Sequence, residues 1–95
     1  MEQRLQLSHP AGKKAVTMVK SKYDIIKKAI LKCLDKKGGL SHTDMLKAMN
    51  DDFKKNKITF EGSVEWYMES VKLDLEANKI IKRYKEKSKF KFKLT

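Results

Sequence analysis

A strict alternation of lysine and apolar residues constrains the fold of this 95-residue chain more than any other feature. Residues 89–94 read KFKFKL, and a period of two is the period of a β-strand. We therefore expect the two phenylalanines and the leucine to point inward and the three lysines outward. Residues 80–85 are rich in β-branched and aromatic side chains and are predicted to be the partner strand, with a turn at residues 86–88. A two-stranded hairpin is marginal alone, so it must pack on helices within one domain.

An amphipathic helix is predicted directly before this hairpin. Ser63 is its expected N-cap, with Thr59 as an alternative, and Asn78 is its expected left-handed stop. One apolar stripe should face the core, a second apolar patch lies well away from it, and a third face is polar, net acidic and spaced for surface ion pairs. The stripe comprises Val64, Tyr67, Met68, Val71 and Leu75, the patch Trp66, Leu73 and Ala77, and the acidic face Glu65, Glu69, Lys72 and Glu76.

Two further helices are predicted earlier in the chain. Ser21 is the expected N-cap of the first, with Asp24 three residues later as in a capping box, and Gly38-Gly39 is its expected end. Leu40 then offers one inward residue, as a single β-bridge residue does, and Ser41 is the expected cap of the second helix. The predicted buried residues are Tyr23, Ile26, Ile30, Cys33 and Leu34 in the first helix, and Met45, Leu46, Met49 and Phe53 in the second.

Residues 1–20 are predicted to be an N-terminal arm before a domain at residues 21–95. Within the arm, residues 8–12 have turn chemistry, with a proline that fixes φ and a glycine that permits positive φ. Residues 15–19 are β-prone and predict an extra strand or an extended segment. Residues 2–7, EQRLQL, suit a helical turn. The whole order is arm, helix, bridge, helix, helix, strand, strand.

Several classes of protein are disfavoured by the sequence. No apolar run approaches the ~20 residues of a membrane span, and the first residues lack the apolar stretch of a signal peptide. A single cysteine, Cys33, excludes an internal disulfide framework and fits a reducing cytoplasm. His9, in a turn, and His42, expected to face solvent, form no metal signature with it. Without a nucleophile–base pair or a cofactor fingerprint, we expect no enzyme, cofactor, metal site or small-molecule ligand.

The net charge of +11 is unevenly distributed along the chain. Residues 61–78 carry five acidic side chains and one basic, whereas residues 79–95 carry eight basic side chains and one acidic. The basic excess favours an anionic partner, nucleic acid above all. However, only Arg4 and Arg83 are arginine, so the charge also fits a lysine-rich solvated surface that binds nothing.

The element order resembles that of a winged helix-turn-helix domain over Tyr23 to Thr95. The most specific likeness is the junction at residues 73–83, LDLEANKIIKR, and the chain also closes on Leu-Thr. The resemblance implies an α+β fold of three helices with a C-terminal two-stranded β-wing, here with an N-terminal arm or extra strand. In DNA-binding members the third helix enters the major groove and the wing touches the backbone or minor groove.

A second resemblance covers nearly the whole chain. Residues 8–13 (SHPAGK), Tyr23, residues 62–67 (GSVEWY) and residues 71–77 (VKLDLEA) are similar to a family of short bacterial proteins catalogued only as a domain of unknown function. It implies a stand-alone winged helix and supplies no established activity. From the whole sequence we expect a cytoplasmic bacterial protein.

The first functional prediction is weak or non-specific binding of duplex DNA, as in a small transcriptional regulator. Lysines of the wing and the first helix would neutralise phosphates with counterion release. Base readout should be slight, because Glu65, Glu69 and Glu76 on the third helix repel phosphates. The predicted nucleic-acid contacts are Lys28, Lys32, Lys36, Lys82, Arg83, Lys85, Lys87, Lys89, Lys91 and Lys93.

The alternative is a protein-interaction or homodimerisation module with no nucleic-acid role. Its interface would be Trp66 and Leu73 together with the acidic face of the third helix, because large aromatic residues contribute strongly to association when buried. A plainer explanation is that the N-terminal arm covers these two side chains.

Overall fold

Three helices and two small antiparallel sheets make up the fold. The structure, a computed structural model, describes residues 3–12, 15–37 and 39–95, without the side chains of residues 36 and 37. Gly38, part of the predicted helix end, lies outside the described residues. The predicted α+β order is confirmed, in the sequence β1 (Arg4–Gln6), β2 (Thr17–Val19), α1 (Lys20–Lys37), β3 (Leu40–Ser41), α2 (His42–Lys55), α3 (Val64–Ala77), β4 (Ile81–Glu86) and β5 (Lys89–Leu94).

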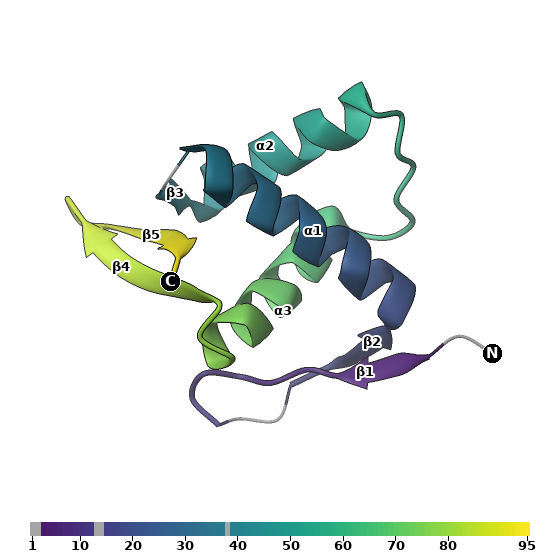
Figure 1. The fold of residues 1–95 in the computed structure, drawn as a ribbon, viewed down its shortest axis with the longest axis horizontal. Helices are drawn as coiled ribbons and strands as arrows, with labels where there is room; N and C mark the ends of the chain where they lie inside the picture. Colours follow the sequence, from purple (N-terminus) through teal and green to yellow (C-terminus); the bar gives the residue numbers. More distant parts are fainter. Residues whose placement is uncertain (1–2, 13–14, 38) are drawn as a thin grey trace.

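The helices occupy the middle of the molecule, with a sheet on each of two sides (Figure 1). β1 and β2 form a ribbon beside the beginning of α1, while β3, β5 and β4, in that order, form a sheet at the other end. Leu40 of β3 pairs with Phe92 of β5, which confirms the predicted bridge between the first two helices. The C-terminal hairpin is therefore the larger part of a three-stranded sheet, with β5 in its centre.

One hydrophobic core joins the helices, the hairpin and the arm. The apolar residues predicted to face inward on α3 are buried or half-buried, as expected from a helical period. The arm contributes Leu7 and Met18, which are 4% and 2% exposed. The arm is thus part of the same core as the helices, whose fully buried side chains include Ile26, Ile30, Leu34, Met45, Met49, Met68, Val71 and Leu75.

Two predicted N-caps are confirmed. The Ser41 hydroxyl accepts the Asp44 N–H at 3.2 Å at the start of α2, and the Ser63 hydroxyl accepts the Trp66 N–H at 3.2 Å at the start of α3. Each satisfies a backbone donor that has no partner within its helix. Ser63 rather than Thr59 therefore sets where α3 begins.

Two predictions for the arm and the start of α1 are wrong. The described part of the predicted helical turn at residues 2–7 is not helical, because Arg4–Gln6 is a strand that pairs with β2, with Leu5 opposite Met18. Residues 15–19 do contain the predicted extra strand. α1 begins at Lys20 directly after β2, so Ser21 lies inside the helix instead of capping it.

The predicted stop of α3 is displaced by one residue. Asn78 has φ −90° and caps the helix, with its N–H and its Nδ2 both donating to the Asp74 carbonyl. The left-handed residue is Lys79, at φ 59°. Asn78 satisfies the last turn while Lys79 turns the chain toward β4.

The hairpin turn is shorter than predicted, because Glu86 belongs to β4. Lys87 and Ser88 form the two-residue turn, and both have positive φ, 49° and 69°. The inward prediction for Phe90 is wrong: it is 54% exposed, whereas Phe92 is 3% exposed. β3 pairs only with Lys91 and Phe92, so Phe90 lies beyond the part of the strand that reaches the core.

Candidate nucleic-acid interface

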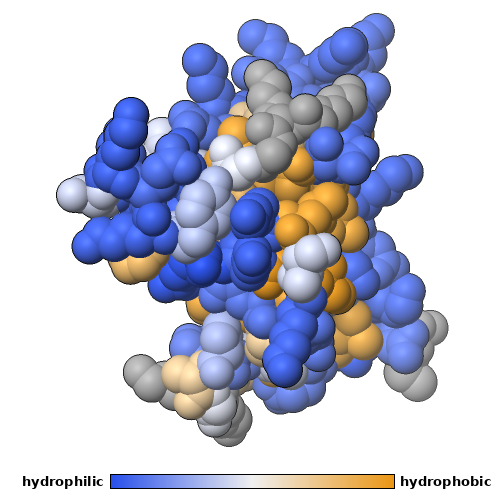
Figure 2. Space-filling view, turned by 60° about the vertical axis from the view of Figure 1, so that its left-hand side comes forward, coloured by the Kyte–Doolittle hydropathy of each residue, from blue (hydrophilic) through white to orange (hydrophobic). Residues whose placement is uncertain are grey.

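The outer face of the hairpin gathers four lysines. In the register of β4 and β5, Lys82 lies opposite Lys93, Tyr84 opposite Lys91 and Glu86 opposite Lys89. Alternation places these side chains on the same side of the sheet, away from Phe92. Figure 2 turns this end of the molecule forward and shows mostly hydrophilic side chains over it. We call this surface the lysine face; it comprises Lys82, Tyr84, Glu86, Lys89, Lys91 and Lys93.

Tyr84 is a member of the lysine face that the site prediction missed. Its ring lies 5.2 Å from Lys93 Nζ, and its hydroxyl lies against Gly39, where a Cβ atom would have no room. Lys91 Nζ donates to the Glu86 carboxylate at 3.1 Å, a hydrogen bond that raises the pKa of the Lys91 ammonium. The spacing of Lys82 and Tyr84, two residues apart on one strand, was the available signal.

Arg83 and Lys85 lie on the opposite face of the hairpin. Arg83 donates from Nε and Nη2 to the two carboxylate oxygens of Glu76, at 3.1 and 3.3 Å. Its guanidinium also lies 5.4 Å from the ring of Phe92 and 5.5 Å from that of Phe90. Such a fork-shaped pair is geometrically specific, so Arg83 joins the hairpin to α3 and is not part of the lysine face.

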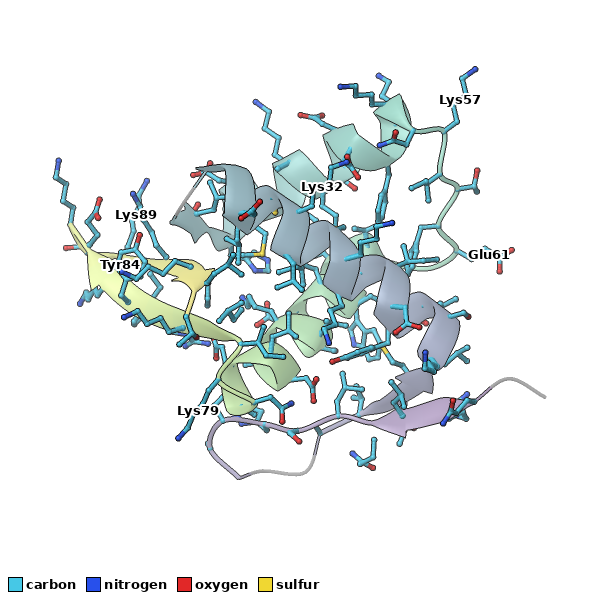
Figure 3. The ribbon with its side chains drawn as sticks, in the orientation of Figure 1. Lys32, Lys57, Glu61, Lys79, Tyr84 and Lys89 are labelled. Carbon is cyan, nitrogen blue, oxygen red and sulfur yellow. The ribbon has the colours of Figure 1, made fainter. Side chains whose placement is uncertain are left out.

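Of the predicted first-helix lysines, Lys28 and Lys32 lie away from the lysine face. Lys32 lies between α1 and α2, where its Nζ pairs with Asp52 at 2.7 Å, and Figure 3 shows it well apart from Tyr84 and Lys89. Lys28 is exposed on α1. The side chain of Lys36 lies outside the described residues. Lys87, in the turn, lies at the tip of the hairpin.

The carboxylates on the outer side of α3 have partners within the chain. The Glu65 carboxylate lies 3.1 Å from His42 Nε2, and the Glu69 carboxylate lies 3.6 Å from Lys72 Nζ. Glu76 forms the ion pair with Arg83. Glu65 and Glu69 nevertheless stay 61% and 49% exposed. This helix therefore presents partly neutralised negative charge where a DNA-reading helix would present donors.

Lys72 is buried, contrary to its predicted place on the surface. It is 3% exposed, and its Nζ lies 4.2 Å from the centre of the Phe92 ring and 3.1 Å from His42 Nδ1. Burial lowers the pKa of this ammonium, and the neighbouring Glu69 and Glu76 carboxylates oppose that effect. His42, expected to face solvent, accepts from Lys72 and donates to Glu65, so it joins α2 to α3.

Trp66 and Leu73, the two residues of the predicted partner interface, lie in different surroundings. Trp66 is 48% exposed and packs edge-on against Tyr67, with ring centres 4.9 Å apart. Leu73 is half-buried beside the arm, near Pro10 and Ala11. The arm therefore partly covers Leu73 and leaves Trp66 open.

The part of the chain that the structure describes contains no group of three side chains able to hold a metal ion, and none of its helices is both long and apolar enough to cross a membrane. Cys33 is half-buried, and burial raises the pKa of its thiol, which disfavours the nucleophilic thiolate.

Comparison with known protein families gives a match over most of the chain. The model of a family of unknown function (DUF6958) matches residues 4–92. No curated protein and no solved structure matches the chain.

Proposed function

The chain belongs to this family of unknown function, and we propose, from its geometry, that it is a small non-enzymatic DNA-binding protein of the winged-helix type. The lysine face holds the sugar–phosphate backbone of duplex DNA, and α3 does not read bases. We expect weak, sequence-tolerant binding in the cytoplasm, as in an accessory transcriptional regulator.

The observation that carries this proposal is the pairing of Lys82 with Lys93. Like charges directly opposite each other on one face of a sheet are destabilising, and a bound phosphate removes that repulsion. Lys89 and Lys91 extend the same surface, and Glu86 is its one carboxylate. In the free protein these lysines repel one another, and their combined positive charge attracts a polyanion.

A charge-reversal experiment tests the lysine face. Lys82, Lys89 and Lys93 are changed together to Glu, and the anisotropy of a labelled random-sequence duplex reports binding. The matched control changes to Glu three exposed lysines at or just after the end of α2, Lys54, Lys55 and Lys57, which gives the same net charge. We expect the first variant to lose binding and the second to retain most of it. Equal losses would mean that only total charge matters, and the lysine face would be abandoned.

Salt dependence supplies the second measure of the same interface. If four lysines neutralise phosphates, the logarithm of the association constant should fall linearly with the logarithm of the salt concentration, with a slope of about −3.5. A slope near zero would contradict phosphate neutralisation, whatever the affinity.

A second candidate function is association with a protein through α3. It is favoured by Trp66, a large aromatic residue that is 48% exposed on α3, the helix that also carries the exposed carboxylates of Glu65 and Glu69. Light scattering tests the homodimer form: a dimer that Trp66→Ala dissociates supports it, and a monomer at high concentration excludes it.

A further inference from the structure

A groove lies between the turn of the N-terminal arm and the beginning of the hairpin. His9, Pro10 and Ala11 form its arm side, and Leu73, Lys79 and Ile81 form the other side, around a volume of about 640 Å³. Figure 3 shows Lys79 where α3 passes into β4, beside the loop of the arm. We call this the arm groove. It brings together two stretches that the sequence analysis singled out, residues 8–12 and 73–83.

Hydrogen bonds fix the arm side of the groove. The Ser8 N–H donates to Asp74 Oδ1 at 2.8 Å, which ties the arm to α3. The Gly12 N–H donates to the His9 carbonyl at 2.9 Å and the Ala11 N–H to His9 Nδ1 at 3.0 Å. Gly12 has φ 75°, a conformation that glycine adopts without strain. The turn is therefore held in place before any ligand arrives.

The surfaces of the groove combine apolar and cationic groups. Leu73, Pro10 and Ala11 supply apolar area, while Lys79 and Lys82 stand at the rim. Neither lysine forms an ion pair within the part of the chain that the structure describes. Among the side chains that line the groove, the one carboxylate is that of Glu76, which is only 8% exposed and is neutralised by Arg83.

Donors outnumber acceptors at the rim. His9 Nδ1 accepts a backbone N–H, so the proton of the neutral ring lies on Nε2, which then donates. Lysine offers donors alone, and the Glu76 oxygens already accept from Arg83. A ligand that fits must therefore bring acceptors and negative charge, together with an apolar part for Leu73.

We propose that the arm groove binds a small organic carboxylate with an apolar tail. The carboxylate meets Lys79 and Lys82, and the tail lies on Leu73 and Pro10. The volume is within the range of small-molecule sites, which combine an apolar lining with a few placed polar groups. Because Ile81 and Lys82 begin β4, such a ligand contacts the hairpin where it leaves α3.

Hexanoate and benzoate, each matched with its uncharged amide, are the probes that test the proposal. Amide chemical shifts of the ¹⁵N-labelled protein are followed up to about 10 mM probe, which detects dissociation constants near 1 mM. We expect saturable shifts at Ala11, Gly12, Lys79 and Ile81 with the carboxylates, and much smaller shifts with hexanamide and benzamide.

Two lysines in the same backbone setting give matched variants. Lys79 follows the capping residue Asn78 at φ 59°, and Lys57 follows the capping residue Asn56 at φ 54°, but only Lys79 lines the groove. Lys79→Gln should weaken carboxylate binding about two- to fivefold, as for an exposed charge contact, and Lys57→Gln should leave it unchanged. The proposal is overturned by shifts that do not saturate, by equal shifts with the amides, or by equal effects of the two variants.

Discussion

At the scale of single residues, Tyr23 links α1 to α3 through a buried carboxylate. Its hydroxyl donates to Asp74 Oδ2 at 2.6 Å. Burial, this hydrogen bond and the charge of Asp74 raise the pKa of the phenol well above its usual value of 10. The folded state therefore holds the proton more tightly than the unfolded state. This contribution to stability is complete below about pH 10 and is lost as the pH rises above it.

Urea unfolding between about pH 8 and pH 11 measures this loss. The free energy of unfolding of the wild type should fall more steeply with pH than that of Tyr23→Phe, which lacks the titrating group. The comparison removes the titration of the lysines, which both proteins share. Parallel curves would show that Tyr23 does not hold its proton in the folded state.

Lys72 shows why some single residues could not be predicted. Its spacing from Glu69 and Glu76 is that of a surface ion pair, and the contact with Glu69 exists. What buries it is the ring of Phe92, twenty residues later in the chain, and His42 from α2. Helical periodicity describes one helix at a time, so a face covered by distant segments looks exposed.

At the scale of elements, the hairpin turn is under conformational strain. Lys87 and Ser88 both have positive φ, as in the type I′ turns that favour Asn-Gly. Ser88→Gly should therefore raise the free energy of unfolding by about 0.5–1 kcal/mol, since a left-handed conformation costs a residue with a Cβ atom about that much or more. The urea midpoint with an unchanged m value is the measurement.

The same substitution inside a helix serves as the control. Ser70→Gly in α3 should lower stability by about 0.5–1 kcal/mol, because glycine is unfavourable in a helix interior. Two changes of the same sign would show that the effect does not arise from the turn geometry.

Elements with local signals could be predicted from the sequence. The alternation at residues 89–94 marks β5, and Ser41 and Ser63 mark the beginnings of α2 and α3. β1 could not be predicted, because Arg4–Gln6 is a strand only through pairing with β2. Three residues carry too little periodicity to distinguish a strand from a helical turn.

At the scale of the whole molecule, the sequence identifies the lysines but not their grouping. Strand register separates Arg83 and Lys85 from the lysine face, and the packing of α1 on α2 takes Lys32 away from it. The arm groove has no local signal, since it forms only where residues 8–12 meet residues 73–83. A site made by distant segments depends on the tertiary fold.

The largest expected effect on the whole molecule comes from removing the arm. Deleting residues 1–16 removes the buried side chain of Leu7, uncovers Met18 and takes the Ser8 N–H from Asp74. Burial of one such side chain contributes about 2 kcal/mol, and loss of a donor from a buried carboxylate costs about 2 kcal/mol more. The free energy of unfolding of a domain of this size is about 5–15 kcal/mol in total. The shortened chain should therefore have a melting temperature far below that of the full chain, as measured by circular dichroism.

Gln6→Ala, which removes an exposed side chain of the same ribbon and keeps Leu7, should shift the melting temperature by only a few degrees. If the shortened chain had the same melting temperature as the full chain, the arm would contribute nothing to stability, and the conclusion that it shares the hydrophobic core of the helices would be wrong.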